Sequence, residues 1–323
     1  MPTLLIHGGA GGDGEWGGPT KLDPARIDCL SIVLQEVGRS LERGEIDALQ
    51  AVNIAVQVME NEPLFNAGRG SVLNADGGIS MDASIMRGKD GAAGSCAGIK
   101  RVKNPINLAR SLLDAGWPVM MVSEGAEQFA KKQGLEMVSQ NSLITDLRNA
   151  QLEKWRSTQA RVGATDEDDA ALNAQLDHDI ETELSESGTV GAVALDIDGN
   201  VAAATSTGGM TGKPAGRIGD SALIGAGTWA DNKVAISCTG VGEAYIRVAA
   251  AKRLADIYEL TDTTLAQAAQ RVLDEVGPLG GRGGLIAVSA TGEFTLPFRT
   301  TLMYRGIWDN GKITTAIGPN SKP

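Results

Sequence analysis

The chain contains many hydroxyl side chains and very little histidine, and this limits the chemistry that it can do. A nucleophilic hydroxyl usually needs a base beside it, and histidine is the common one. The 323 residues include two histidines, His7 in a short apolar segment and His178 in an acidic one. A Ser–His–Asp arrangement is therefore hard to build. A residue whose own α-amine accepts the proton avoids this limit, because a free α-amine has a pKa of about 7.7–8.0.

Gly188-Thr189 is where cleavage of the chain would create such a residue. A long acidic stretch ends at Gly188, whose missing Cβ leaves its carbonyl open to attack. Thr189 then begins a β-rich segment, and β-branching leaves its side chain few χ1 angles. The same residues also fit a strand that simply begins with a β-favouring residue, so both interpretations stay open at this point.

Three further segments carry groups that suit an amino-acid substrate. Thr205 to Thr211 places hydroxyls at the end of a strand, before a glycine turn. Arg217 and Asp220 put a guanidinium and a carboxylate in one short loop, which matches an α-carboxylate and an α-ammonium, although a surface ion pair has the same pattern. Cys238 to Glu243 ends a strand and begins a helix, where backbone N–H groups and the Thr239 hydroxyl can stabilise an oxyanion.

The glycine run near the N-terminus matches two known motifs by its letters alone. Gly9 to Gly14 fits G-x-G-x-x-G, but Trp16 to Pro19 follows and helical spacing begins only near Pro24, so a dinucleotide site is not expected. Ile6 to Gly9 is similar to the oxyanion loop of esterases, yet the chain has no G-x-S-x-G. A tight turn with positive φ angles explains the run equally well.

Hydrophobic periodicity predicts the elements that must position these groups. We expect strands at residues 3–7, 119–122, 189–195, 201–207, 234–238, 285–288 and 292–296, with short alternating segments around Val72 and from Ile79 to Ile85. We expect helices at residues 24–43, 48–59, 125–132, 243–258 and 264–276, and one that begins at Asn104 with Pro105 at its first position. Asp198-Gly199 predicts a hairpin between two of the strands. Both halves of the chain mix helices and strands.

Composition and charge exclude several classes of protein. Of the net charge of −11, a charge of −7 lies between Gln151 and Gly188, where ten acidic residues meet three basic ones. No basic face remains for nucleic acid. The nearest thing to a long apolar run, Thr189 to Ile197, is interrupted by Asp196 and far too short for a bilayer. Three cysteines without tight spacing and no secretory signal favour a cytoplasmic protein without a membrane partner.

Taken in chain order, the motifs resemble the plant-type L-asparaginase/isoaspartyl peptidase family of N-terminal nucleophile hydrolases. The resemblance covers nearly the whole chain apart from the acidic stretch. The motifs that carry it are Ile6 to Gly11, Leu64 to Gly68, Gly188 to Val193, Thr205 to Thr211, Gly216 to Ser221 and Ser237 to Gly240. The family implies an α+β fold, a four-layer αββα sandwich, assembled as a dimer of cleaved α/β heterodimers.

The resemblance also implies how the nucleophile is made. Thr189 would be both the autoproteolytic and the catalytic nucleophile, freed by cleavage after Gly188. Thr207 matches the threonine that hydrogen-bonds and orients it, and Asn66 matches a loop asparagine near it. Residues 1–188 would form the α subunit, with a flexible acidic linker at 150–188, and residues 189–323 the β subunit of one globular domain.

The matching substrate-site residues lie in the second half of the chain. Arg217 and Asp220 match the residues that hold the α-carboxylate and the α-ammonium. Thr239 and Gly240 match residues that form the oxyanion hole and contact the substrate. Gly242 matches a glycine that contacts the substrate. The implied activity is hydrolysis of L-asparagine and of isoaspartyl dipeptides, both small molecules, without an organic cofactor. The sequence does not rank these two substrates.

A loop in bacterial members of the family holds a structural sodium ion through main-chain oxygens. The matching positions are Met59, Glu60, Glu62, Phe65, Ala67 and Arg69.

Two other interpretations of the whole chain stay open. A glycosylasparaginase-like amidase would carry Asp before its nucleophile, where Gly188 stands, and an unprocessed, non-catalytic binding protein could share the fold.

Overall fold

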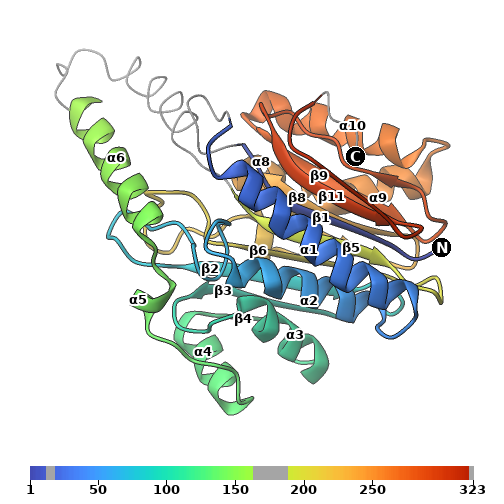
Figure 1. Cartoon of the computed structure of the whole chain (residues 1–323), viewed down its shortest axis with the longest axis horizontal. Helices are drawn as coiled ribbons and strands as arrows, with labels where there is room; N and C mark the ends of the chain where they lie inside the picture. The colour runs from blue at the N-terminus through green and yellow to red at the C-terminus, as the bar shows by residue number, and fades with distance from the viewer. Residues whose placement is uncertain (12–18, 163–187, 320–323) are drawn as a thin grey trace.

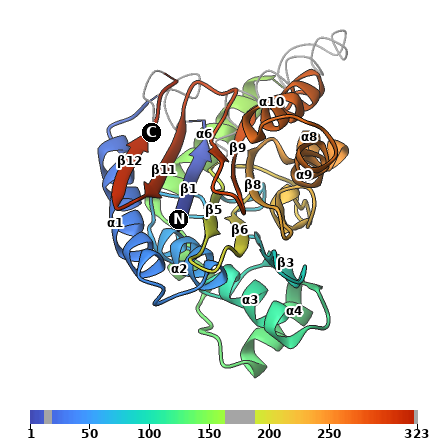
Figure 2. The same cartoon turned by 90° about the vertical axis from the view of Figure 1, so that its right-hand side faces the viewer.

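The structure is a computed structural model that describes residues 1–11, 19–162 and 188–319, and these residues form four layers. Helices cover the outer face of an eight-stranded sheet, a four-stranded sheet packs on its inner face, and further helices cover the second sheet (Figures 1 and 2). This confirms the expected α+β fold, a four-layer αββα sandwich.

The two sheets differ in size and are mostly antiparallel. The larger sheet has the spatial order β12-β11-β1-β5-β6-β2-β3-β4 and the smaller one β10-β9-β8-β7. In chain order the strands are β1 (Thr3–Ala10), β2 (Met81–Arg87), β3 (Ala93–Ile99), β4 (Met120–Val122), β5 (Val190–Leu195), β6 (Val201–Thr207), β7 (Thr228–Ala230), β8 (Val234–Gly240), β9 (Gly283–Ser289), β10 (Phe294–Thr295), β11 (Met303–Asp309) and β12 (Lys312–Ala316).

The helices fall into two outer layers. The larger sheet is covered by α1 (Asp23–Glu42), α2 (Ala48–Asn61), α3 (Pro105–Ala115) and α4 (Ser123–Lys132). The smaller sheet is covered by α8 (Gly242–Val248), α9 (Ala250–Leu260) and α10 (Leu265–Val276). The remaining elements are α5 (Gln140–Leu143), α6 (Asp146–Val162), which projects from the body in Figure 1, and the 3-10 turns η3 (Asp220–Ala222) and η4 (Gly277–Leu279). Within the described ranges, no helix is both long and apolar enough to cross a bilayer.

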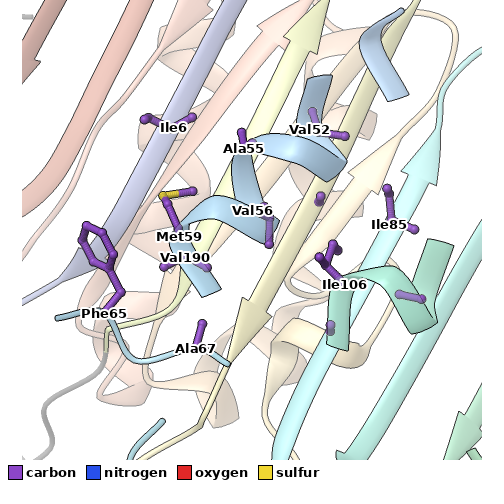
Figure 3. Packing of buried hydrophobic residues seen from close by; sticks show 14 of the residues in the cluster. Ile6, Val52, Ala55, Val56, Met59, Phe65, Ala67, Ile85, Ile106 and Val190 are labelled. Atoms are coloured by element: carbon purple, nitrogen blue, oxygen red, sulfur yellow. The ribbon is translucent and has the colours of Figure 1, made fainter. Parts of the chain in front are cut away.

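Three buried apolar clusters fill the three interfaces between the layers. Along β1, Leu4 and Ile6 point toward the helices and Leu5 toward the smaller sheet, because successive strand residues face opposite sides. On the helical side, Met59 of α2 lies beside Val190 at the start of β5 (Figure 3). Both faces of the larger sheet are therefore covered, which explains why its central strands read as continuous apolar runs.

Gly8 and Gly9 lie inside a strand, and the positive φ angles that the tight-turn interpretation required occur at Gly9 and Gly11. Residues 12–18 of the glycine-rich segment lie outside the described part of the chain. β1 runs to Ala10, and its register against β11 shifts between His7 and Gly9, where Gly9 has a φ of 110°. Gly8 is also required, since a Cβ there would lie 2.5 Å from Cε1 of Phe65. The run thus allows a bulge and a close approach of the loop that contains Phe65.

Several other elements differ from expectation for local reasons. Ala249 has a φ of 49° and divides the expected helix 243–258 into α8 and α9. The linker expected from residue 150 is helical in α6 as far as Val162, and residues 163–187 lie outside the described part of the chain. Strand β3 was not expected, because its small residues have low β-propensity. The close packing of α3 on this strand requires such a small residue, since a Cβ on Gly94 would collide with the carbonyl of Ala109. Strands β11 and β12 were also not expected, and no strand forms around Val72.

Candidate active site

Thr189 lies at the entrance to β5, and its hydroxyl and its carbonyl group are both held. Its side chain is 5% exposed. Its Oγ1 donates to Oγ1 of Thr207 at 3.2 Å, and its carbonyl oxygen accepts from Nδ1 of His7 at 3.0 Å. The hydroxyl and the backbone of this residue are therefore both fixed in place, as a nucleophile requires.

Thr207 ends β6 and is oriented by the turn that follows it. Its Oγ1 also accepts a hydrogen bond from the backbone N–H of Gly209 at 2.9 Å. Strands β5 and β6 are antiparallel neighbours joined through the hairpin at Asp198-Gly199, with Val190 paired to Ser206. The expected hydrogen bond between the two threonines follows from this register.

Asn66 connects the turn after β6 to the residue before the nucleophile. Its Nδ2 donates to the carbonyl of Gly209 at 2.7 Å, and its Oδ1 accepts from the backbone N–H of Val72 at 2.9 Å. A Cβ added to Gly188 would lie 3.0 Å from the Asn66 Cβ. The side chain thus packs against the Gly188-Thr189 junction, as expected, and its amide nitrogen and oxygen each form a hydrogen bond with the backbone.

Thr239 and Gly240 end β8 beside the N-terminal strand. Oγ1 of Thr239 accepts from the backbone N–H of Ala10 at 3.2 Å, and in the described part of the chain its proton goes to no acceptor. Gly240 has a φ of 154°, and a Cβ there would collide with the carbonyl of Arg282. The Thr239 hydroxyl is therefore available to donate a hydrogen bond to a developing oxyanion, which a hydroxyl that already donates to another acceptor could not do.

Arg217 is paired with Glu243 and not with its loop neighbour Asp220. Its Nε and Nη2 donate to the two carboxylate oxygens of Glu243 at 2.7 and 2.6 Å, in a bidentate arrangement. The Arg217 side chain is only 12% exposed, whereas Glu243 is 54% exposed. An incoming carboxylate can therefore replace the more exposed Glu243 at a guanidinium that is already oriented.

Asp220 is buried with part of its carboxyl group unpaired. Within the described residues its Oδ2 has no hydrogen-bond partner. Burial raises the pKa of this carboxyl group to about 7, although the positive charge of Arg217 opposes the rise. Gly242 packs against it, since a Cβ there would lie 2.8 Å from Oδ1 of Asp220. A buried, unpaired carboxyl group is a suitable partner for a substrate ammonium group.

Two buried charges that support this loop were not expected from the sequence. Asp82 of β2 accepts from the backbone N–H of Gly98 at 3.0 Å and of Gly219 at 3.5 Å. Lys213 donates to the carbonyl of Ser80 at 2.6 Å, and burial lowers the pKa of its ammonium group while Asp82 opposes that change. A single acidic residue inside the mostly apolar strand β2 was the available signal.

The loop after α2 brings main-chain oxygens together in a way that suits a small cation. The carbonyl groups of Pro63 and Phe65 both point to the place that a Cβ on Gly70 would fill. Within the part of the chain that the structure covers, the carbonyl oxygens of Ala67 and Arg69 accept no hydrogen bond. Those of Met59, Glu60 and Glu62 each accept one backbone hydrogen bond, which leaves a lone pair on each.

The side chains offer no such cation site. No group of three or more His, Cys, Asp or Glu residues that could hold a metal occurs in the described ranges. Glu60 is buried, its Oε1 accepts from Oγ of Ser206 at 2.6 Å, and burial raises its pKa to about 8. The residues therefore fit main-chain ligation only.

Two packed sheets covered by helices on both sides, a four-layer αββα sandwich, are consistent with the fold class of N-terminal nucleophile hydrolases. The chain belongs to the asparaginase family, which it matches over residues 1–317.

Three characterised relatives cover nearly all of the chain. It is 45% identical to isoaspartyl peptidase from Escherichia coli (strain K12), over 98% of this chain and 95% of the relative. It is 38% identical to the isoaspartyl peptidase/L-asparaginase of Rattus norvegicus, over 98% of this chain and 88% of the relative. The corresponding human protein is 37% identical over 99% of this chain and 97% of its own length. The expected family is confirmed.

The raised pKa of Asp220 predicts a pH-dependent gain in stability when the charge is removed. Between its ordinary pKa of 3.8 and about 7, the folded state holds a proton that the unfolded state has lost. The contribution of Asp220 to the free energy of unfolding is therefore most favourable below about pH 4, where the carboxyl group is protonated in both states. This contribution is lost as the pH rises through about 7 and the buried group becomes charged. Asp220→Asn, made in a Thr189→Ala background, should therefore raise the melting temperature more at pH 8.5 than at pH 5.5.

The matched control is Asp198→Asn, because Asp198 is an exposed aspartate. Its effect on the melting temperature should be small and equal at the two pH values. An Asp220→Asn gain that is the same at both pH values would contradict the buried, proton-binding carboxyl group.

Proposed function

We propose that the chain is a self-cleaving amidohydrolase that converts L-asparagine to aspartate and ammonia and cleaves isoaspartyl dipeptides. The observation that carries the proposal is the position of Thr189, with its hydroxyl directed at Thr207 and its backbone held, directly after Gly188. Relatives with this pair of activities in their names support the choice of substrates.

The first reaction is cleavage of the chain by its own hydroxyl. Oγ1 of Thr189 attacks the carbonyl carbon of Gly188, and the peptide nitrogen leaves as the α-amine of Thr189. Water then hydrolyses the resulting ester and frees the hydroxyl. The products are an α subunit of residues 1–188 and a β subunit of residues 189–323, which is 135 residues long.

In the cleaved enzyme, Thr189 supplies both nucleophile and base. Its free α-amine has a pKa near neutrality and takes the proton of its own hydroxyl. The hydroxyl oxygen attacks the side-chain amide of asparagine or the β-linked peptide bond. Thr239 and the Gly240 backbone stabilise the oxyanion, and ammonia or an amino acid leaves with the proton. Water then releases aspartate from the ester.

The substrate's amino-acid end is the part that both substrates share. Arg217 binds the α-carboxylate in the bidentate way in which it now binds Glu243, and Asp220 binds the α-ammonium. Gly242 leaves room beside Asp220 for that ammonium. Asn66 holds the Gly188-Thr189 junction and the turn at Gly209 in register.

Self-cleavage predicts a two-chain protein. Freshly purified wild-type protein should resolve on a denaturing gel into the two subunits, and Thr189→Ala should stay intact and inactive because it lacks the attacking oxygen. Thr189→Ser is the matched control, since it keeps that oxygen and should still cleave. A Thr189→Ala protein that splits at the same bond would contradict the assignment.

Substrate recognition by Arg217 predicts a binding defect without a processing defect. Arg217→Ala should cleave normally, while its KM for asparagine rises about 30-fold or more, because a buried charge partner of the carboxylate is lost. Glu243→Gln is the matched control, since it keeps the guanidinium and should not raise KM. An unchanged KM in Arg217→Ala would remove this residue from the site.

We also propose that the loop after α2 holds a structural sodium ion through the carbonyl oxygens of Met59, Glu60, Glu62, Phe65, Ala67 and Arg69. When bound, the ion would be coordinated by these carbonyl oxygens and would rigidify the loop next to Asn66. The melting temperature should then be several degrees higher in sodium chloride than in choline chloride at equal ionic strength, and the rise should saturate with sodium concentration. Equal melting temperatures in the two salts would contradict the site.

The remaining features follow from the family and the sequence. We propose a dimer of α/β heterodimers in the cytoplasm, acting on small-molecule substrates without an organic cofactor. The acidic residues after Val162, which lie outside the described residues, would stand at the C-terminal end of the α subunit once the chain is cut.

A further inference from the structure

His7 is a fully buried histidine that the reaction outlined above does not use. It lies on β1, between the two sheets, and both of its ring nitrogens are engaged. Nδ1 lies 3.0 Å from the carbonyl oxygen of Thr189, and Nε2 lies 2.9 Å from Oγ of Ser237 on β8. The side chain therefore joins the nucleophile to the second sheet.

Behind Ser237, three more hydroxyls extend this contact through the interface between the sheets. Ser237 is 2.7 Å from Oγ1 of Thr205, and Thr228 donates to Thr205 at 2.6 Å. Ser84 contacts Thr228 at 2.8 Å and the carbonyl of Ser221 at 2.6 Å. We call Ser237, Thr205 and Thr228 the hydroxyl chain. Ser84 then connects the hydroxyl chain to the carbonyl of Ser221, the residue that follows Asp220 of the substrate site.

Proton counting fixes the tautomer of His7. The Thr189 carbonyl can only accept, so Nδ1 carries the hydrogen. Burial lowers the pKa of His7 to about 3, so the ring is neutral and Nε2 must be an acceptor. Ser237 then donates to Nε2 and accepts from Thr205 at 2.7 Å, because the other acceptor near the Thr205 hydroxyl, the Gly227 carbonyl, is farther away at 3.3 Å. Thr205 in turn accepts from Thr228. The hydroxyl chain thus runs in one direction and ends at the Thr189 carbonyl.

We propose that His7 is a positioning residue for Thr189, held by the hydroxyl chain in the orientation and tautomer that donate to the Thr189 carbonyl. This inference rests on the proposed function, in which Thr189 is the nucleophile. It gives a role to the histidine of the N-terminal motif that is distinct from acid–base catalysis.

The position of Thr189 in the sheet explains why such a bond is needed. The β1–β5 ladder ends with the pair His7 and Gly191, so Thr189 lies beyond its last rung. After cleavage, Thr189 becomes the first residue of its chain, and chain ends that nothing holds are poorly ordered. The bond from His7 limits rotation about the Cα–C bond of Thr189, and so fixes its amine and hydroxyl relative to the site.

Gly191 provides a second, independent observation. A Cβ on Gly191 would collide with both Oγ of Ser237 and Nε2 of His7. The absence of a side chain at this point of β5 leaves the space in which these two groups meet. Gly191 thus accommodates the same hydrogen bond that fixes the tautomer of His7.

Acid–base catalysis by His7 does not fit this geometry. Both ring nitrogens already have partners, and neither partner is the Thr189 hydroxyl. That hydroxyl donates to Thr207 instead. A base would need a nitrogen within reach of the proton that it removes.

The first test compares three substitutions of His7 in the full chain. Asparagine can place an amide N–H where Nδ1 is, whereas glutamine reaches toward Ser237 and leucine does neither. His7→Asn should keep kcat within about threefold of wild type, while His7→Gln and His7→Leu should lose about 10- to 100-fold, as expected for a misplaced nucleophile. KM should stay within about twofold in all three, since Arg217 and Asp220 are untouched.

The rate constant of self-cleavage provides the same comparison if a variant stays intact. Equal losses in all three variants would mean that His7 only fills space, and no loss in His7→Leu would overturn the proposal outright. If the wild-type protein itself neither cleaves nor hydrolyses asparagine, the proposed function fails instead.

The second test needs no substitution at His7 and no activity. Long-range proton–nitrogen NMR spectra distinguish the two neutral tautomers from the protonated ring. Because the chain has two histidines, His178→Gln assigns the remaining signal to His7. We expect a neutral ring with the proton on Nδ1 from pH 5.5 to pH 8.5. A proton on Nε2, or protonation near pH 6.5, would overturn the proposal.

Discussion

The structure depends on how one polar residue, Thr189, is held at the edge of the interface between the two sheets. Thr189 lies beyond the last rung of the β1–β5 ladder, so the ladder does not position it. Side chains do so instead, with Thr207 accepting from its hydroxyl and His7 donating to its carbonyl. Leaving a buried polar group unpaired costs about 1–3 kcal/mol, so alternative placements of this residue are disfavoured.

The fold brings the partners of Thr189 together from distant parts of the sequence. Strands β1, β5 and β6 are neighbours in one sheet, and β8 faces them from the other. Close approach at this point depends on residues without side chains. Gly191 makes room for His7 and Ser237, and Gly208 makes room for Asn66, whose Oδ1 a Cβ would strike. The site is therefore a property of the packed sheets and not of one loop.

The layer order was expected only from the family resemblance, whereas the residues themselves made Gly188-Thr189 a candidate cleavage site. The contact of Thr207 with Thr189 and the position of Asn66 beside Gly188 agree with expectation. The pairing of Arg217 with Glu243 could not be predicted, because it depends on how α8 begins beside the loop.

Buried polar groups were the hardest features to interpret from the sequence. His7 appeared unsuited to catalysis, and only the three-dimensional contacts assign it a role. Asp82 and the hydroxyl chain were hidden for the same reason, since some of their partners lie far away in the sequence: His7 is 230 residues from Ser237, and Asp82 is 137 residues from Gly219. A direct test of the central claim is to mix the enzyme with L-asparagine, quench in acid during the first turnovers, and measure the masses of its chains. The account predicts two chains, with a transient β-aspartyl group on Thr189 of the 189–323 chain, and full activity from a single unbroken chain would contradict it.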